Sequence, residues 1–133
     1  MAETDISQKF IKSQKDIYGR VLYIEKVFNN LKKGEPDIFA IYKGMPIYME
    51  AKLINSISLT NLYPFKKIQL EILAIKARAG ATCIGLLGNG EEYRYIMYDK
   101  LTEHITKEQY LNAEIFEWEK LRSLWTKSIL TNF

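Results

Sequence analysis

The chain has 133 residues and a mass of 15.6 kDa, which fits one domain and leaves no room for a second of ordinary size. With 47% apolar residues and a single cysteine, Cys83, the composition excludes a disordered chain, a disulfide framework and a zinc site built from cysteines. A net charge of +3 allows a polyanionic partner without requiring one, and no apolar run reaches the roughly 20 residues that cross a bilayer. We therefore expect a single intracellular, cytoplasmic domain with no membrane partner.

The amino-terminal part of the chain predicts a helix followed by a strand. A helix is expected over about residues 4–18, because its apolar residues recur on one side. A strand is expected over residues 20–28, which are rich in β-branched and aromatic residues. It leads into a basic loop that contains Lys32 and Lys33.

Residues 37–54 predict a β-hairpin. Two runs of strand-forming residues flank Gly44–Met45, and glycine at the first central position favours a two-residue type II′ turn there. This turn would place Asp37 opposite Lys52. Because side chains alternate along a strand, Glu50 would share a face with both of them. The opposite face would be a continuous apolar surface made of Ile38, Ala40, Tyr42, Ile47, Met49, Ala51 and Leu53.

The rest of the chain predicts two further helices and two strands. A helix over 65–79 precedes strands over 81–87 and 92–98, which a Gly-Asn-Gly turn joins. A capping box at Thr106–Gln109 and a row of apolar residues predict a long amphipathic helix over about 106–130. The expected fold class is α/β, with a central mixed β-sheet flanked by helices in one domain, residues 1–133.

Asp37, Glu50 and Lys52 match what metal-assisted hydrolysis of a phosphodiester requires. Two carboxylates are suited to hold Mg²⁺, which keeps several waters and also binds phosphate oxygens. The lysine points the same way as Glu50, where it would orient the attacking water or stabilise the developing charge. The alternative interpretation is a cross-strand ion pair between Asp37 and Lys52. Glu50 favours the functional interpretation, because two neighbouring carboxylates need a cation or a raised pKa.

The segments Gly34–Asp37 and Glu50–Lys52 resemble the bipartite PD-(D/E)XK motif of the restriction-endonuclease-like nuclease superfamily. Over about residues 3–98 the chain is also similar to small Holliday-junction resolvases and to virus-type replication–repair nucleases. The resemblance implies a restriction-endonuclease-like core and nuclease activity with Mg²⁺, for which Mn²⁺ is a possible substitute. It also leaves a viral gene as one source of the chain.

The resemblance assigns roles to single residues. Lys52 would be the catalytic lysine. An acidic residue near the start of the first helix, Glu3 or in its place Asp5, would complete the site. Glu3 has an alternative explanation as an acid favoured by the helix dipole. The implied metal ligands are Asp37, Glu50, the main-chain carbonyl of Ala51 and Glu3.

Basic residues near this site form a candidate DNA-binding set. They are either an ordinary solvated surface or a rim that contacts DNA phosphates. The resemblance adds a glutamine from the helix over 65–79, which is otherwise a polar position on a half-exposed helix. The set consists of Lys32, Lys33, Lys66, Lys67 and Gln69.

The expected function is that of a Mg²⁺-dependent endodeoxyribonuclease acting on branched DNA, with a four-way junction as the favoured substrate. By analogy with resolvases we expect a homodimer, with Trp118 and Trp125 as candidate interface anchors. One alternative is a nuclease of the same superfamily that cuts flapped, nicked or generic duplex DNA. Another is a DNA-binding module on the same fold that does not cleave.

Overall fold

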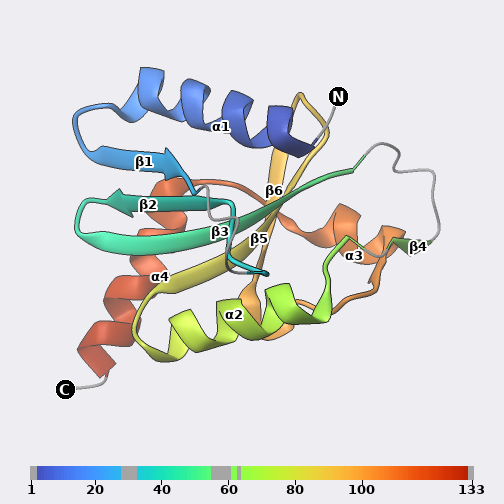
Figure 1. Cartoon of the computed structure of the whole chain (residues 1–133). Helices are drawn as coiled ribbons and strands as arrows, with labels where there is room; N and C mark the ends of the chain where they lie inside the picture. The colour runs from blue at the N-terminus through green and yellow to red at the C-terminus, as the bar shows by residue number, and fades with distance from the viewer. Residues whose placement is uncertain (1–2, 28–32, 55–60, 63, 132–133) are drawn as a thin grey trace.

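The computed structural model describes residues 3–27, 33–54, 61–62 and 64–131 of the chain (Figure 1). Within these residues no helix has the length and apolar character needed to cross a membrane. The elements are α1 (Glu3–Tyr18), β1 (Leu22–Lys26), β2 (Ile38–Tyr42), β3 (Met45–Leu53), β4 (Asn61–Leu62), α2 (Lys67–Arg78), β5 (Thr82–Gly88), β6 (Tyr93–Met97), the 3-10 turn η1 (Tyr98–Lys100), β7 (Ile105–Thr106), α3 (Lys107–Asn112), β8 (Glu114–Ile115) and α4 (Trp118–Thr131).

The centre of the fold is a mixed sheet with the strand order β1-β2-β3-β5-β6-β8. β3 and β5 are parallel and are connected through α2, whereas the other neighbouring strands of this sheet are antiparallel. β4 and β7 form a separate two-stranded sheet. The mixed sheet flanked by helices that the sequence predicts is confirmed.

Helices cover both faces of the sheet (Figure 1). The apolar face of the β2–β3 hairpin is buried as predicted, and it packs against Phe10 of α1 and Trp118 and Leu121 of α4. The opposite face carries a second core, in which Leu73 of α2 and Phe65 contribute. Gly85 of β5 makes room for this layer, because a Cβ atom there would lie 2.6 Å from the Phe65 ring. The face that carries Glu50 is therefore partly covered by α2.

The hairpin turn differs from the prediction. Tyr42 pairs with Met45, so the two central residues are Lys43 and Gly44, with φ angles of 46° and 85°. Positive φ at both positions is the type I′ conformation, whose twist matches that of the flanking strands. The predicted register was thus wrong by two residues. Continued by one residue, the observed register places Asp37 opposite Glu50 and not opposite Lys52. An even shift leaves every side chain on its predicted face.

The prediction of one long helix over 106–130 was also wrong, although the predicted capping box at Thr106 and Gln109 is present. The chain forms α3, then β8, then α4. β8 pairs with β6, and Nη1 of Arg94 donates to the carbonyls of Leu111 and Ala113, which stops α3. Local propensity alone would favour one continuous helix here. The pairing of β8 at the edge of the sheet divides that helix into α3 and α4.

Trp118 belongs to the core and is 2% exposed. Its ring stacks on that of Tyr42, and its Nε1 donates to Gln14. The prediction that Trp118 anchors a subunit interface was therefore wrong, because its side chain is already buried within its own chain. Trp125 is half-buried and packs against the same core.

Candidate active site

The predicted catalytic residues meet at the carboxyl-terminal half of β3 and the start of β2. Glu50 and Lys52 are two residues apart on β3 and share one face, and Asp37 directly precedes β2. Glu50 is 2% exposed and Lys52 is 6% exposed, whereas Asp37 is half-buried. The structure thus brings together the three residues on which the sequence-based hypothesis rests.

Only one of the two oxygens of the Glu50 carboxylate has polar partners among the described residues. Its Oε1 accepts a hydrogen bond from Gln69 Nε2 at 3.0 Å, and Lys52 Nζ lies 3.5 Å from the same oxygen. Its Oε2 is buried with no hydrogen-bond partner among the described residues. Burial and, after it, the nearby Asp37 raise the pKa of Glu50 to about 8, although Lys52 lowers it. An unsatisfied buried oxygen of this kind favours binding of a cation.

Asp37 is held by the strand beside it. Its Oδ2 accepts a hydrogen bond from the backbone N–H of Ala51 at 3.2 Å. Because the N–H and C=O of one strand residue point to the same side, the Ala51 carbonyl is directed toward the Asp37 side of β3. Two carboxylates and one carbonyl are hard oxygen donors of the type that Mg²⁺ binds. The residues present therefore fit the implied metal.

The described residues contain no group of three or more His, Cys, Asp or Glu that could hold a metal ion. The side chains of Glu3 and Asp5 lie outside the described residues, so their roles stay predictions. The backbone of α1 is suitably placed, because Ile6 Cγ2 lies 3.2 Å from a Cβ built on Gly88. Gly88 pairs with Leu53, the residue after Lys52, so α1 starts at this end of the sheet.

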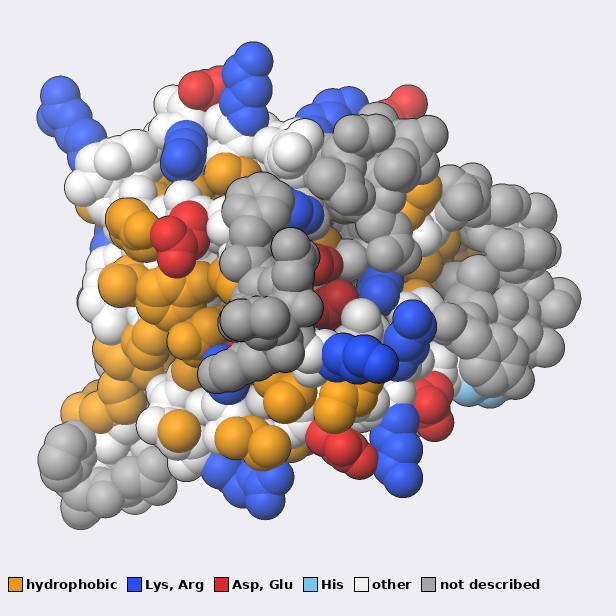
Figure 2. All heavy atoms as spheres, viewed as in Figure 1, with side chains coloured by type: hydrophobic (Ala, Val, Ile, Leu, Met, Phe, Trp, Pro, Cys, Tyr) orange, Lys and Arg blue, Asp and Glu red, His pale blue; other side chains and the backbone are white. Residues whose placement is uncertain are grey.

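Of the candidate DNA-binding lysines, Lys32 lies outside the described residues, and Lys33, Lys66 and Lys67 are exposed. Figure 2 shows Lys and Arg side chains beside acidic side chains near the centre of this face. Exposure makes these lysines accessible to a phosphate backbone, and their contact with DNA stays a prediction.

Gln69 has a position that sequence reasoning did not anticipate. It is the third residue of α2, and its Oε1 accepts a hydrogen bond from the backbone N–H of Lys66 at 2.9 Å. This bond fixes the side chain, so that its Nε2 donates to Glu50. A glutamine three residues after the N-cap of a helix was the available signal. Its contact with Glu50 depends on the packing of α2 on the sheet.

The loop before Asp37 is also attached to α2. Glu35 lies 3.3 Å from Lys76. Gly34 has a φ of 83°, and a Cβ there would lie 2.8 Å from Ile68. α2 therefore contacts both halves of the motif, since it reaches Glu50 through Gln69 and the first half through Lys76 and Ile68.

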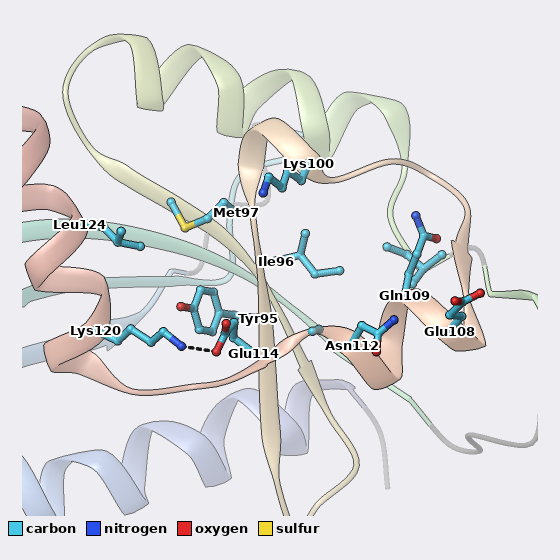
Figure 3. A pocket seen from close by; sticks show the side chains of 12 residues that line it. Tyr95, Ile96, Met97, Lys100, Glu108, Gln109, Asn112, Glu114, Lys120 and Leu124 are labelled. Carbon is cyan, nitrogen blue, oxygen red and sulfur yellow. Dashed lines mark hydrogen bonds and ion pairs between the residues drawn. The ribbon is translucent and has the colours of Figure 1, made fainter.

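A cavity of about 690 Å³ lies elsewhere, between β6, α3 and α4 (Figure 3). Tyr95, Met97 and Leu124 give it an apolar lining, and Lys120 and Glu114, which also line it, form an ion pair. None of the predicted site residues lines it. The candidate active site is instead the region around Glu50.

The chain is similar to known proteins in its structure. No model of a known family matches the chain, and no curated protein matches its sequence. Among solved structures, Hjc of Archaeoglobus fulgidus, a Holliday junction resolvase from an archaeal hyperthermophile, superposes with a TM-score of 0.62. The identity is 18%, and the match covers 80% of this chain and 92% of that chain.

The chain has a restriction-endonuclease-like fold. The fold class that the motif implies is thereby confirmed. Because an activity belongs to a site and not to a fold, the residues of this chain have to carry the functional argument.

Proposed function

We propose that this protein is a Mg²⁺-dependent endonuclease that hydrolyses phosphodiester bonds in branched DNA, with a four-way junction as its substrate. The observation that carries the proposal is the buried Glu50 carboxylate, which has one oxygen without a partner beside Asp37 and Lys52. The resolvase-like fold supports the choice of a branched substrate.

In this proposal Asp37, Glu50 and the Ala51 carbonyl hold the metal, with Glu3 as a further ligand. The bound Mg²⁺ supplies Lewis-acid polarisation of the phosphate and a more acidic water, and Mn²⁺ can replace it. Gln69 keeps the Glu50 carboxylate in place, and Lys52 orients the attacking water and stabilises charge that develops on the phosphate. Lys32, Lys33, Lys66 and Lys67 contact the DNA backbone, and a homodimer places one site on each of two strands.

The test compares wild type with Glu50→Gln, which keeps the size of the side chain but removes its charge. Glu71→Gln is the matched control, because Glu71 is an exposed acid on α2. Each protein is mixed with an end-labelled four-way junction and with a linear duplex of the same sequence, with Mg²⁺ or with a chelator. We expect wild type and Glu71→Gln to nick the junction only with Mg²⁺, and Glu50→Gln to lose cleavage by about 100-fold or more while it still binds.

Other outcomes would select the alternatives. Equal cleavage of junction and duplex would identify a nuclease without preference for branched DNA. Binding by all three proteins without cleavage under any metal would identify a DNA-recognition module and reject the enzyme.

A further inference from the structure

Lys76, in the last turn of α2, has a largely buried side chain. The side chain is 23% exposed, and its Nζ lies 3.3 Å from Oε2 of Glu35, whose own side chain is 17% exposed. The same Nζ lies 4.4 Å from the centroid of the Tyr48 ring. Lysine side chains are mostly exposed in folded proteins. This ammonium instead contacts a carboxylate and the face of an aromatic ring, and both contacts favour one fixed position for it.

Glu35 belongs to the loop that leads to Asp37, the first of the proposed metal ligands. The backbone after this loop is fixed by β1, because the carbonyl of Asp37 accepts a hydrogen bond from the N–H of Val27 at 2.7 Å. Pro36, directly before Asp37, has no N–H to donate. Within the part of the chain that the structure describes, no backbone hydrogen bond joins residues 33–36 to another segment. The approach to Asp37 therefore depends on side-chain contacts.

Two contacts with α2, which runs along the sheet (Figure 1), hold this approach. A Cβ on Gly34 would lie 2.8 Å from Cγ1 of Ile68, so the loop lies directly against the helix there. The second contact is the ion pair of Glu35 with Lys76. This pair also gives Glu35 a partner. Without Lys76, a largely buried carboxylate two residues from Asp37 would be left unpaired, and it would compete for a cation at the site.

We propose that Lys76 is a positioning residue, which holds Glu35 on α2 and thereby keeps the Asp37 carboxylate directed at the metal site. This inference rests on the proposed nuclease function and adds a residue to its site. The Asp37 carboxylate accepts a hydrogen bond from the N–H of Ala51 at 3.2 Å. The position of that carboxylate can therefore be followed at a single backbone N–H, with or without a bound metal.

The first test measures hydrogen exchange at Ala51 by NMR in chelator, for wild type, Lys76→Met, Glu35→Gln and the double variant. The double variant leaves no buried charge unpaired, so it keeps the test valid if a single variant fails to fold. Arg78→Met is the matched control, because Arg78 is an exposed cation in the same helical turn. We expect exchange at Ala51 to be faster by about 10-fold or more in the first three variants, as for a lost hydrogen bond to a charged group. Arg78→Met should keep the wild-type rate, and the N–H of Met49 in the same strand should keep its rate in every variant.

The second test measures Mg²⁺ affinity by calorimetry without DNA. Lys76→Met and Glu35→Gln should each weaken Mg²⁺ binding by about 10- to 100-fold, because a residue that supports a metal ligand is lost. The double variant should lose no more than either single variant, since the two side chains form one link. Affinity for a four-way junction in chelator should stay that of wild type in every variant.

Unchanged exchange at Ala51 in the double variant would overturn this inference, and so would losses of Mg²⁺ affinity that add. Weaker junction binding by Lys76→Met but not by Glu35→Gln would also overturn it, because Lys76 would then contact a phosphate. The nuclease proposal is tested separately by cutting with Mg²⁺. If exchange at Ala51 changes as expected but wild type binds no Mg²⁺ and cuts no DNA, only the nuclease proposal fails. If wild type binds Mg²⁺ and cuts the junction, but the double variant matches it in exchange and Mg²⁺ affinity, only the Lys76 inference fails.

Discussion

At the scale of single residues, Glu50 makes the stability of this protein depend on pH. Its pKa is raised to about 8, chiefly by burial and then by Asp37. An unfolded chain releases this proton near pH 4.5, whereas the folded protein keeps it up to about pH 8. Folding therefore takes up a proton between these values, and stability falls as pH rises through this window.

This predicts that the free energy of unfolding of the metal-free protein decreases between pH 5.5 and pH 7.5, with a contribution from Glu50 of at most about 1.4 kcal/mol per pH unit. Glu50→Gln should lack this contribution, because its amide does not titrate. Urea unfolding of both proteins in chelator measures the difference. Mg²⁺ binds the ionised carboxylate, so it should stabilise wild type more at pH 8 than at pH 6. Parallel pH curves for the two proteins would contradict the assignment.

At the scale of elements, α2 joins the two halves of the motif. Its first turn holds Glu50 through Gln69, and its last turn reaches Glu35 through Lys76. α3 starts in a similar way, since Gln109 Oε1 accepts from the backbone N–H of Thr106. The two glutamines have the same capping role, but only Gln69 contacts the candidate active site.

This pair allows a matched prediction. Gln69→Ala and Gln109→Ala should each lower the free energy of unfolding by about 0.5–2 kcal/mol, because each loses a helix cap. Only Gln69→Ala should also reduce cleavage of bound DNA, by about 10- to 100-fold, because it removes the side chain that holds Glu50, the proposed metal ligand. Affinity for DNA in chelator should not change. A loss of affinity with normal cleavage of the bound DNA would instead show that Gln69 contacts DNA, as the sequence-based hypothesis has it.

At the scale of the whole molecule, α1, α4 and the sheet share one aromatic core. The Trp118 ring packs against Phe10 and Tyr42, which come from distant parts of the chain, and against the neighbouring Phe116. Trp118→Ala should therefore lower the free energy of unfolding by about 3–5 kcal/mol. The effect should not depend on protein concentration, because Trp118 is buried within one chain. Denaturation at two protein concentrations checks this, and a loss that shrinks at the higher concentration would assign Trp118 to a subunit contact.

The sequence by itself determined which residues could form the site and on which sheet face they lie. Alternation along a strand depends on the backbone alone, so Glu50 and Lys52 share a face whatever covers it. Asp37 joined them even though the predicted turn was wrong, because the register shifted by two residues and kept its parity. The same local rules located the start of α3 at Thr106 and Gln109.

Only the tertiary structure decided which partners these residues have. Three hydrogen bonds join residues far apart in the chain. They run from Gln69 to Glu50, from Arg94 to Leu111 at the end of α3, and from the buried Trp118 to Gln14. The raised pKa of Glu50 is likewise a property of its burial, which no local pattern contains. Local backbone geometry follows from neighbouring residues, whereas burial and long-range contacts depend on how the helices pack on the sheet.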